Sequence, residues 1–255
     1  MSFDPWQYAL GALAAFLIGF SKTGVPGAGI LAVPLMAQVL GARLSVGATL
    51  PLLLLGDGFA VAFYRQHADW GWLRRIAPWV TGGLLVGAVA LKVLGDLHLR
   101  ADPLGPVIGV LILAMLALTL LRERLGDRLR PTSRVGTVLT GILAGFSTMV
   151  SNAAGPVMAV FMTAAGLPKE RLLGTTAWTF LIFNVAKVPL LLLLTADNPA
   201  EPLFTASTLL FTGTLLPALG LGALAGRHLL PFVPERGFRV LVLGLSGLAA
   251  VRLIV

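Results

Sequence analysis

Cysteine is absent from this chain of 255 residues, which excludes disulfide bonds, thiolate nucleophiles and cysteine metal ligands. Charge is scarce as well, because only 12% of the residues are charged, whereas a soluble domain carries about 25%. That leaves too few charged side chains to cover a soluble globule of this length. The 57% of hydrophobic residues equally exclude a disordered chain, which is poor in apolar residues. An integral membrane protein with several spanning segments is the class that remains.

Basic residues outnumber acidic ones and give a net charge of +8, but their placement does not suit nucleic acid. Most of them lie in four short connections between apolar runs, at residues 64–75, 122–134, 167–171 and 226–239. The connections at 95–103 and 196–202 are poor in basic residues. Because cytoplasmic loops are rich in lysine and arginine, we expect the basic connections inside and both chain termini outside. No nucleic-acid partner is expected.

Ten apolar segments can be marked along the chain, and a spanning helix needs about 20 residues. The segments are 6–20, 24–40, 45–63, 76–94, 104–121, 135–150, 153–166, 172–195, 203–225 and 238–255. Four of them are short and form two adjacent pairs. Irregular backbone at membrane depth is tolerated only where it is buried or lines a wet cavity. We therefore predict broken or re-entrant helix pairs at 6–40 and 135–166, and leave open whether each pair spans fully.

The two short pairs resemble each other in sequence. Gly19–Gly29 aligns with Gly145–Gly155, and both stretches begin with Gly-Phe-Ser. The competing interpretation is a chance match among common small residues, but the shared run falls on the same element of each half. We expect Gly29 and Gly155 to permit close helix packing.

A second match follows further along each half, where Gly47-Ala48-Thr49 aligns with Gly174-Thr175-Thr176, and Asp57 with Asn184. Five segments per half would invert the second half, which is typical of secondary transporters whose site lies at the repeat interface. The sequence thus predicts an all-α polytopic membrane protein, with two inverted repeats of about five hydrophobic segments each. The repeats are residues 1–128 and 129–255, within one integral membrane domain.

Three ionisable residues lie within or beside apolar segments, where each costs about 2.5–3.5 kcal/mol on insertion scales and so indicates function. They are Lys22 at the first break, Asp57 in the third segment and Lys187 past the middle of the eighth. Other interpretations are a wet surface loop for Lys22, an internal partner for Asp57 and snorkelling for Lys187. The spacing of Thr176, Phe180, Asn184 and Lys187 puts them on one helix face.

The two breaks favour an anion. We expect the second helix of each pair to begin just after its break, with Pro26 in a first turn and Ser151 or Asn152 as an N-cap. Helix starts carry unpaired N–H groups and a partial positive charge that bind anions. The candidate substrate-binding residues are Ser21, Lys22, Thr23, Gly24, Ser147, Thr148, Ser151, Asn152, Thr176, Asn184 and Lys187. Asp57 is the candidate for the coupling proton or for a gating ion pair with a lysine.

No catalytic or metal-binding pattern is found. His67, His98 and His228 lie in separate loops and lack the His-x-x-x-His spacing of a helical metal site. We therefore expect no enzymatic activity, no cofactor and no metal.

The glycine-rich stretches resemble the sulfite exporter TauE/SafE family of integral membrane proteins. The more specific of the two contains Asn152-Ala153-Ala154-Gly155-Pro156, while the first has Gly27-Ala28-Gly29 where many members carry three glycines. The resemblance covers most of the chain. It implies transport of sulfur oxyanions or organosulfonates, such as sulfite or sulfoacetate, out of the bacterial cytoplasm.

We therefore expect a multi-pass secondary transporter of the cytoplasmic membrane that exports a small sulfur-containing anion, coupled to an ion or proton. Its expected partners are that anion and the lipid bilayer, and a homodimer is left open. The alternatives are an anion channel and a non-transporting membrane scaffold or assembly factor.

Overall fold

The computed structural model describes residues 3–24, 28–97, 103–125, 133–158, 169–229 and 235–255. Nearly all of these are helical and none is in a strand, which confirms the all-α prediction. The elements are α1 (Pro5–Thr23), a 3₁₀ turn η1 (Ala28–Leu31), α2 (Ala32–Leu40), α3 (Ala42–Ala48), α4 (Leu50–Tyr64), a 3₁₀ turn η2 (Arg65–His67), α5 (Trp70–Asp96), α6 (Leu104–Leu125), α7 (Arg134–Ser151), α9 (Lys169–Asp197), α10 (Ala206–Thr214), α11 (Leu216–Leu229) and α12 (Glu235–Ile254).

Several helices are long and apolar enough to cross a membrane, which makes this a multi-pass membrane protein. Within the described ranges these are Ala42–His67, Trp70–Asp96, Leu104–Leu121, Arg134–Ser151 and Arg171–Asp197. A sixth candidate is the pair Ala206–Thr214 and Leu216–His228, which is bent by 45°. The sequence predicted one continuous segment there. Pro217 explains the bend, because proline lacks the N–H that a continuous helix would need.

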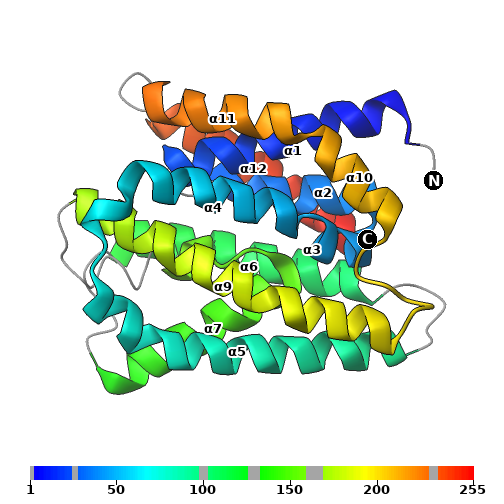
Figure 1. Cartoon of the computed structure of the whole chain (residues 1–255), viewed down its shortest axis with the longest axis horizontal. Helices are drawn as coiled ribbons and strands as arrows, with labels where there is room; N and C mark the ends of the chain where they lie inside the picture. Colours follow the sequence, from blue (N-terminus) through cyan, green and yellow to red (C-terminus); the bar gives the residue numbers. More distant parts are fainter. Residues whose placement is uncertain (1–2, 25–27, 98–102, 126–132, 159–168, 230–234) are drawn as a thin grey trace.

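The helices lie side by side along the long axis of the molecule (Figure 1). α5 and α7 pack together along one edge, α1 and α11 along the opposite edge, and α4 and α9 lie between them (Figure 1). α6 packs on α12. Each of these four contacts joins a helix before residue 128 to one after residue 129, so the two halves of the chain interlock.

Glycines bring the helices at both edges into direct backbone contact. A Cβ at Gly19 would overlap the Leu219 carbonyl of α11, and one at Gly145 would overlap the Val80 carbonyl of α5. Close packing was expected at Gly29 and Gly155, but a Cβ at Gly155 would meet no described atom within 4 Å. A Cβ at Gly29 would meet the Ser21 side chain at 3.1 Å. Close approach is set by which helix face meets a partner, and the alignment alone does not give that face.

The first short pair differs from the expectation at its break. The helix α1 continues through Lys22 and Thr23, which form its last turn, and Gly24 is its C-cap. The Gln7 amide in the first turn of α1 donates to the Val39 carbonyl near the end of α2 at 2.7 Å. The pair therefore begins and ends at the same end of the bundle.

The second pair is only partly described. α7 has 18 residues and is long and apolar enough to span, although a short segment was expected there. The helix that follows is described for residues 155–158 alone. Most of the predicted segment 153–166, and Pro26 in the first pair, lie outside the described residues.

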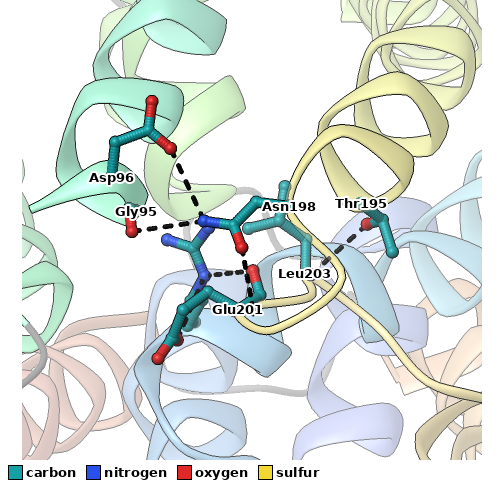
Figure 2. A network of polar contacts seen from close by, with 7 residues as sticks. Gly95, Asp96, Thr195, Asn198, Glu201 and Leu203 are labelled. Atoms are coloured by element: carbon teal, nitrogen blue, oxygen red, sulfur yellow. Dashed lines mark hydrogen bonds and ion pairs between the residues drawn. The ribbon is translucent and has the colours of Figure 1, made fainter. Parts of the chain in front are cut away.

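At one end of the bundle, a polar network ties α3 and α5 to the connection between α9 and α10 (Figure 2). Asn198 donates to the Gly95 carbonyl at 3.3 Å, and Arg43 Nε donates to the Glu201 carbonyl at 2.6 Å. Arg43 is buried, and its guanidinium packs so closely on α5 that a Cβ at Gly95 would overlap it. The sequence argument had not singled out Arg43, because it lies just before an apolar segment.

Candidate functional site

Lys22 and Asp57 form an ion pair between α1 and α4. Lys22 Nζ lies 2.6 Å from Asp57 Oδ1, and the Asp57 side chain is fully buried whereas that of Lys22 keeps 16% exposure. The ammonium group also lies 4.2 Å from the centre of the Phe180 ring on α9, where a cation is attracted by the ring face. The internal partner considered for Asp57 is therefore Lys22.

Asn184 connects this ion pair to the second lysine. Its amide donates to Asp57 Oδ2 at 2.6 Å, and its Oδ1 accepts from Lys187 Nζ at 3.3 Å. Asn184 and Lys187 are spaced i, i+3 on α9, so they emerge on the same face of the helix. The polar stripe predicted on this helix thus faces α1 and α4.

Lys187 is completely buried and does not snorkel to the surface. Besides Asn184, its ammonium donates to Asn152 Oδ1 and lies 3.5 Å from Thr148 Oγ1. All three partners are neutral oxygens, and the described residues give Lys187 no carboxylate within ion-pair distance. Its hydrogen bonds are satisfied while its charge has no direct counter-ion.

Asn152 holds its place through both backbone and side chain. Its φ of 57° is left-handed, a conformation that asparagine tolerates better than most residues. It is the C-cap of α7, with its N–H donating to the Thr148 carbonyl. The prediction that Asn152 is an N-cap is therefore wrong, as is that for Ser151, which is the last residue of α7. The left-handed turn ends α7 and directs Asn152 Oδ1 to Lys187, while Nδ2 donates to the Val46 carbonyl at 3.1 Å.

Several predicted site residues do not join this network. Thr23 donates to the Ala223 carbonyl at 2.6 Å, and a Cβ at Gly24 would overlap Gly226, so both pack against α11. The hydroxyls of Ser147 and Ser151 donate to carbonyls of their own helix. Ser21 and Thr176 are half-buried and, within the described residues, form no hydrogen bond with either lysine. Helix periodicity alone could not show which polar residues face the network, because each helix has polar residues on more than one side.

The sequence argument missed Thr49, which the structure buries close to Asn152. Its hydroxyl lacks a hydrogen-bond partner among the described residues, and Thr49 lines a pocket together with Asn152 and Ser151. A signal was present, because Thr49 aligns with Thr176, which had been chosen as a candidate. Only the tertiary structure shows which member of that aligned pair faces the network.

Comparison with known proteins identifies the family of this chain. A family model described as sulfite exporter TauE/SafE matches residues 11–253. The chain belongs to this family. No curated protein and no solved structure matches it.

Membership in the TauE/SafE family makes the protein a membrane transporter and not an enzyme. The family match covers every residue of the network described above, from Lys22 to Lys187. In the described part of the chain, no group of three histidine or acidic residues lies close enough to hold a metal ion.

Proposed function

We propose that this TauE/SafE protein is a secondary transporter that exports a small sulfur-containing anion, either sulfite or an organosulfonate such as sulfoacetate, across the bacterial cytoplasmic membrane. The observation that carries the proposal is the charge of the network. Lys22 and Lys187 supply two ammonium groups, and Asp57 supplies one carboxylate, which Lys22 already contacts at 2.6 Å. A small anion would supply the missing counter-charge beside Lys187.

The cost of burying charge supports this assignment. Desolvating an ion costs several kcal/mol, and hydrogen bonds to neutral groups compensate it only in part. Lys187 is buried among Thr148, Asn152 and Asn184, so an anion next to it would gain strong attraction in a medium of low dielectric constant. A scaffold or assembly factor has no need of such a group.

Asp57 is the proposed coupling group. When its carboxylate is ionised, it holds Lys22 in the ion pair and accepts from Asn184. A proton on Asp57 would remove that charge and leave Lys22 available to the anion. Proton and anion would then bind together, which is the requirement for symport.

We also propose that the two halves form an inverted repeat with the network at their interface. Asp57 and Asn184, which align with each other, meet in a direct hydrogen bond. Aligned residues can touch in this way only near the axis that relates two repeats. The glycine contacts support the same arrangement, because Gly19 packs on α11 and its aligned residue Gly145 packs on α5.

Flux in proteoliposomes tests this function. Purified protein would be reconstituted, and uptake of sulfite, sulfoacetate, sulfate and acetate measured with and without an imposed pH gradient. We expect saturable, gradient-sensitive transport of sulfite or sulfoacetate. Unsaturable flux that ignores the gradient would indicate a channel, and flux no faster than in empty vesicles would refute a transporter.

The variant Lys187→Met should remove most of this transport. A hydrogen bond to a charged group contributes about 1.5–3 kcal/mol, so we expect a loss of roughly 10- to 100-fold in maximal rate over KM. Lys92→Met is the matched control, since Lys92 is half-exposed and far from the network in the fold. Equal flux in the two variants would show that Lys187 is not part of the site.

A further inference from the structure

The short helix α3 has a joint at each end. Gly41, between α2 and α3, has a φ of 83°, a left-handed conformation that glycine adopts readily and other residues rarely do. At the other end, Pro51 lies in the first turn of α4, and proline has no N–H to donate to the preceding turn. α3 is therefore a separate unit of seven residues that can turn without unfolding its neighbours.

α3 packs against the second half of the chain. It contacts the connection between α9 and α10, where Figure 2 shows Glu201 and Leu203. Arg43 Nε donates to the Glu201 carbonyl at 2.6 Å, and the Gly47 N–H donates to the Leu203 carbonyl at 3.2 Å. A Cβ at Gly47 would overlap that same carbonyl. The backbone of α3 is thus in direct contact with the backbone of the connection.

Arg43 supplies the charged part of this contact. Its side chain is buried, whereas the Glu201 carboxylate, 3.7 Å from Arg43 Nε, is more than half exposed. A hydrogen bond from a charged donor stabilises more than one between neutral groups. If the bond to the Glu201 carbonyl breaks, the guanidinium can move into water beside that exposed carboxylate and regain its hydration. The contact is therefore both strong and reversible.

The inward side of α3 contacts the charged network. The Val46 carbonyl accepts from Asn152 Nδ2 at 3.1 Å, and Asn152 Oδ1 accepts from Lys187. Ser45 and Val46 also line the pocket beside Asn152. That pocket has room for little more than one water molecule, as expected where a passage is closed. A displacement of α3 would widen the pocket and break a hydrogen bond that orients Asn152.

We propose that α3 is a gate, which closes the transport pathway at the end of the bundle that bears Arg43. Arg43 is the positioning residue that keeps the gate shut, because it fastens α3 to the connection between α9 and α10. When Arg43 releases the Glu201 carbonyl, α3 turns about Gly41 and Pro51, and Asn152 becomes accessible from that end. This proposal rests on the proposed transport function and adds one of the barriers that transport requires.

Thiol labelling tests the gate directly, because the chain has no cysteine of its own. Ser151 is buried and lines the pocket beside α3, so Ser151→Cys reports on opening. Purified protein in detergent would be treated with N-ethylmaleimide, so that both ends of the bundle are open to the reagent. Adding Arg43→Gln should raise the labelling rate roughly 10- to 100-fold, since that rate follows the open population. An unchanged rate would overturn the proposal.

A second buried serine separates gating from a general loss of stability. Ser246 on α12 is buried, and its hydroxyl donates to the carbonyl four residues earlier, as that of Ser151 does. Arg43→Gln should leave the labelling rate of Ser246→Cys within about twofold of its value with Arg43 intact. A rise as large as that at Ser151→Cys would show that Arg43 supports the whole fold, and the proposal would fail.

Lys92→Met is the matched control for the lost charge. Lys92 pairs with Asp197 at the same end of the bundle, and both side chains are about half exposed. Because exposed pairs contribute little, this variant should not change the labelling rate of Ser151→Cys. If Lys92→Met raises that rate as much as Arg43→Gln does, the effect is not specific to α3 and the proposal is wrong.

Gly47→Ala opens the gate by a different route and leaves Arg43 in place. The added methyl group would overlap the Leu203 carbonyl and push α3 away from the connection, so labelling of Ser151→Cys should rise at least about fivefold. Gly213→Ala on α10 is the control, since a Cβ there meets no atom of the described residues within 4 Å. Equal rates in the two alanine variants would contradict the gate.

The flux measurement on the wild-type protein distinguishes failure of the gate from failure of the function. Labelling that does not respond to Arg43→Gln or Gly47→Ala in a protein that still transports would overturn the gate alone. A wild-type protein that moves no tested anion would refute the transport function, and with it the need for a gate.

Discussion

Asn152 illustrates how one residue can link the fold to the site. Its left-handed backbone ends α7, and its side-chain amide joins Lys187 to the Val46 carbonyl. The sequence indicated that this residue was special but assigned it to the wrong end of a helix. Asparagine is common at N-caps and also tolerates left-handed turns, so residue type alone could not decide between them.

The ion pair between Lys22 and Asp57 provides a test at the scale of residues. Lys22→Met would leave the fully buried Asp57 carboxylate without its counter-ion, at a cost of about 3–5 kcal/mol. The double variant Lys22→Met, Asp57→Asn should recover much of this loss, because it removes both charges. Thermal unfolding in detergent measures both effects.

The exposed pair of Lys92 and Asp197 serves as the comparison. Both side chains are about half exposed, and exposed ion pairs contribute little to stability. Lys92→Met should therefore leave the unfolding temperature nearly unchanged. If Lys22→Met is equally harmless, the buried pair does not stabilise the protein.

The ionisable and amide residues of the network were all among the candidates predicted from the sequence, namely Lys22, Asp57, Asn152, Asn184 and Lys187. They were recognisable because ionisable and amide side chains are rare in apolar segments. Thr49 had a signal only through its alignment with Thr176, because a hydroxyl within a helix usually bonds to its own backbone. Whether it does so depends on the local geometry.

At the scale of elements, close glycine contacts join each outer pair of helices. Gly83 on α5 faces α7 so tightly that a Cβ there would overlap the Ile142 carbonyl. A Cβ at the neighbouring Gly82 would meet no atom of the described residues within 4 Å. Adjacent residues on one helix therefore differ completely in what they touch.

Substitution by alanine should reveal this difference. Gly83→Ala forces a methyl group into the backbone of α7, and overpacking of this kind costs about 1–3 kcal/mol. Gly82→Ala should be neutral or slightly stabilising, because alanine favours the helix. The measurement is the unfolding temperature of the two variants. Equal temperatures would show that α5 and α7 are not packed through Gly83.

At the scale of the whole molecule, the two ends of the bundle differ in charge. At one end, Asp96 accepts from Asn198 (Figure 2) and Glu201 lies 3.7 Å from Arg43 Nε, while Asp197 pairs with Lys92. Arg65 and Arg227 lie at the opposite end, where the Arg227 guanidinium stacks on the Phe63 ring at 4.4 Å. The positive-inside rule predicts that the arginine-bearing end faces the cytoplasm.

The natural absence of cysteine makes this orientation easy to test. Ala200 and Arg74 are both exposed and lie at opposite ends of the bundle. In intact cells, a membrane-impermeant maleimide should label Ala200→Cys, but Arg74→Cys only after permeabilisation. The reverse labelling pattern would show that the protein has the opposite orientation in the membrane. The unsubstituted protein provides a blank without background labelling.

The sequence by itself determined the class of this protein, its helical character and the rare polar residues in its apolar segments. These follow from composition and local pattern, since every backbone group in lipid must be satisfied within a helix. Only the tertiary structure decided that α10 and α11 bend apart, that Thr23 packs on α11, and that Lys187 meets Asn152. Such facts depend on which helix faces touch. Residues such as Asn152 and Lys187, which lie 35 apart in the chain, come together only through packing.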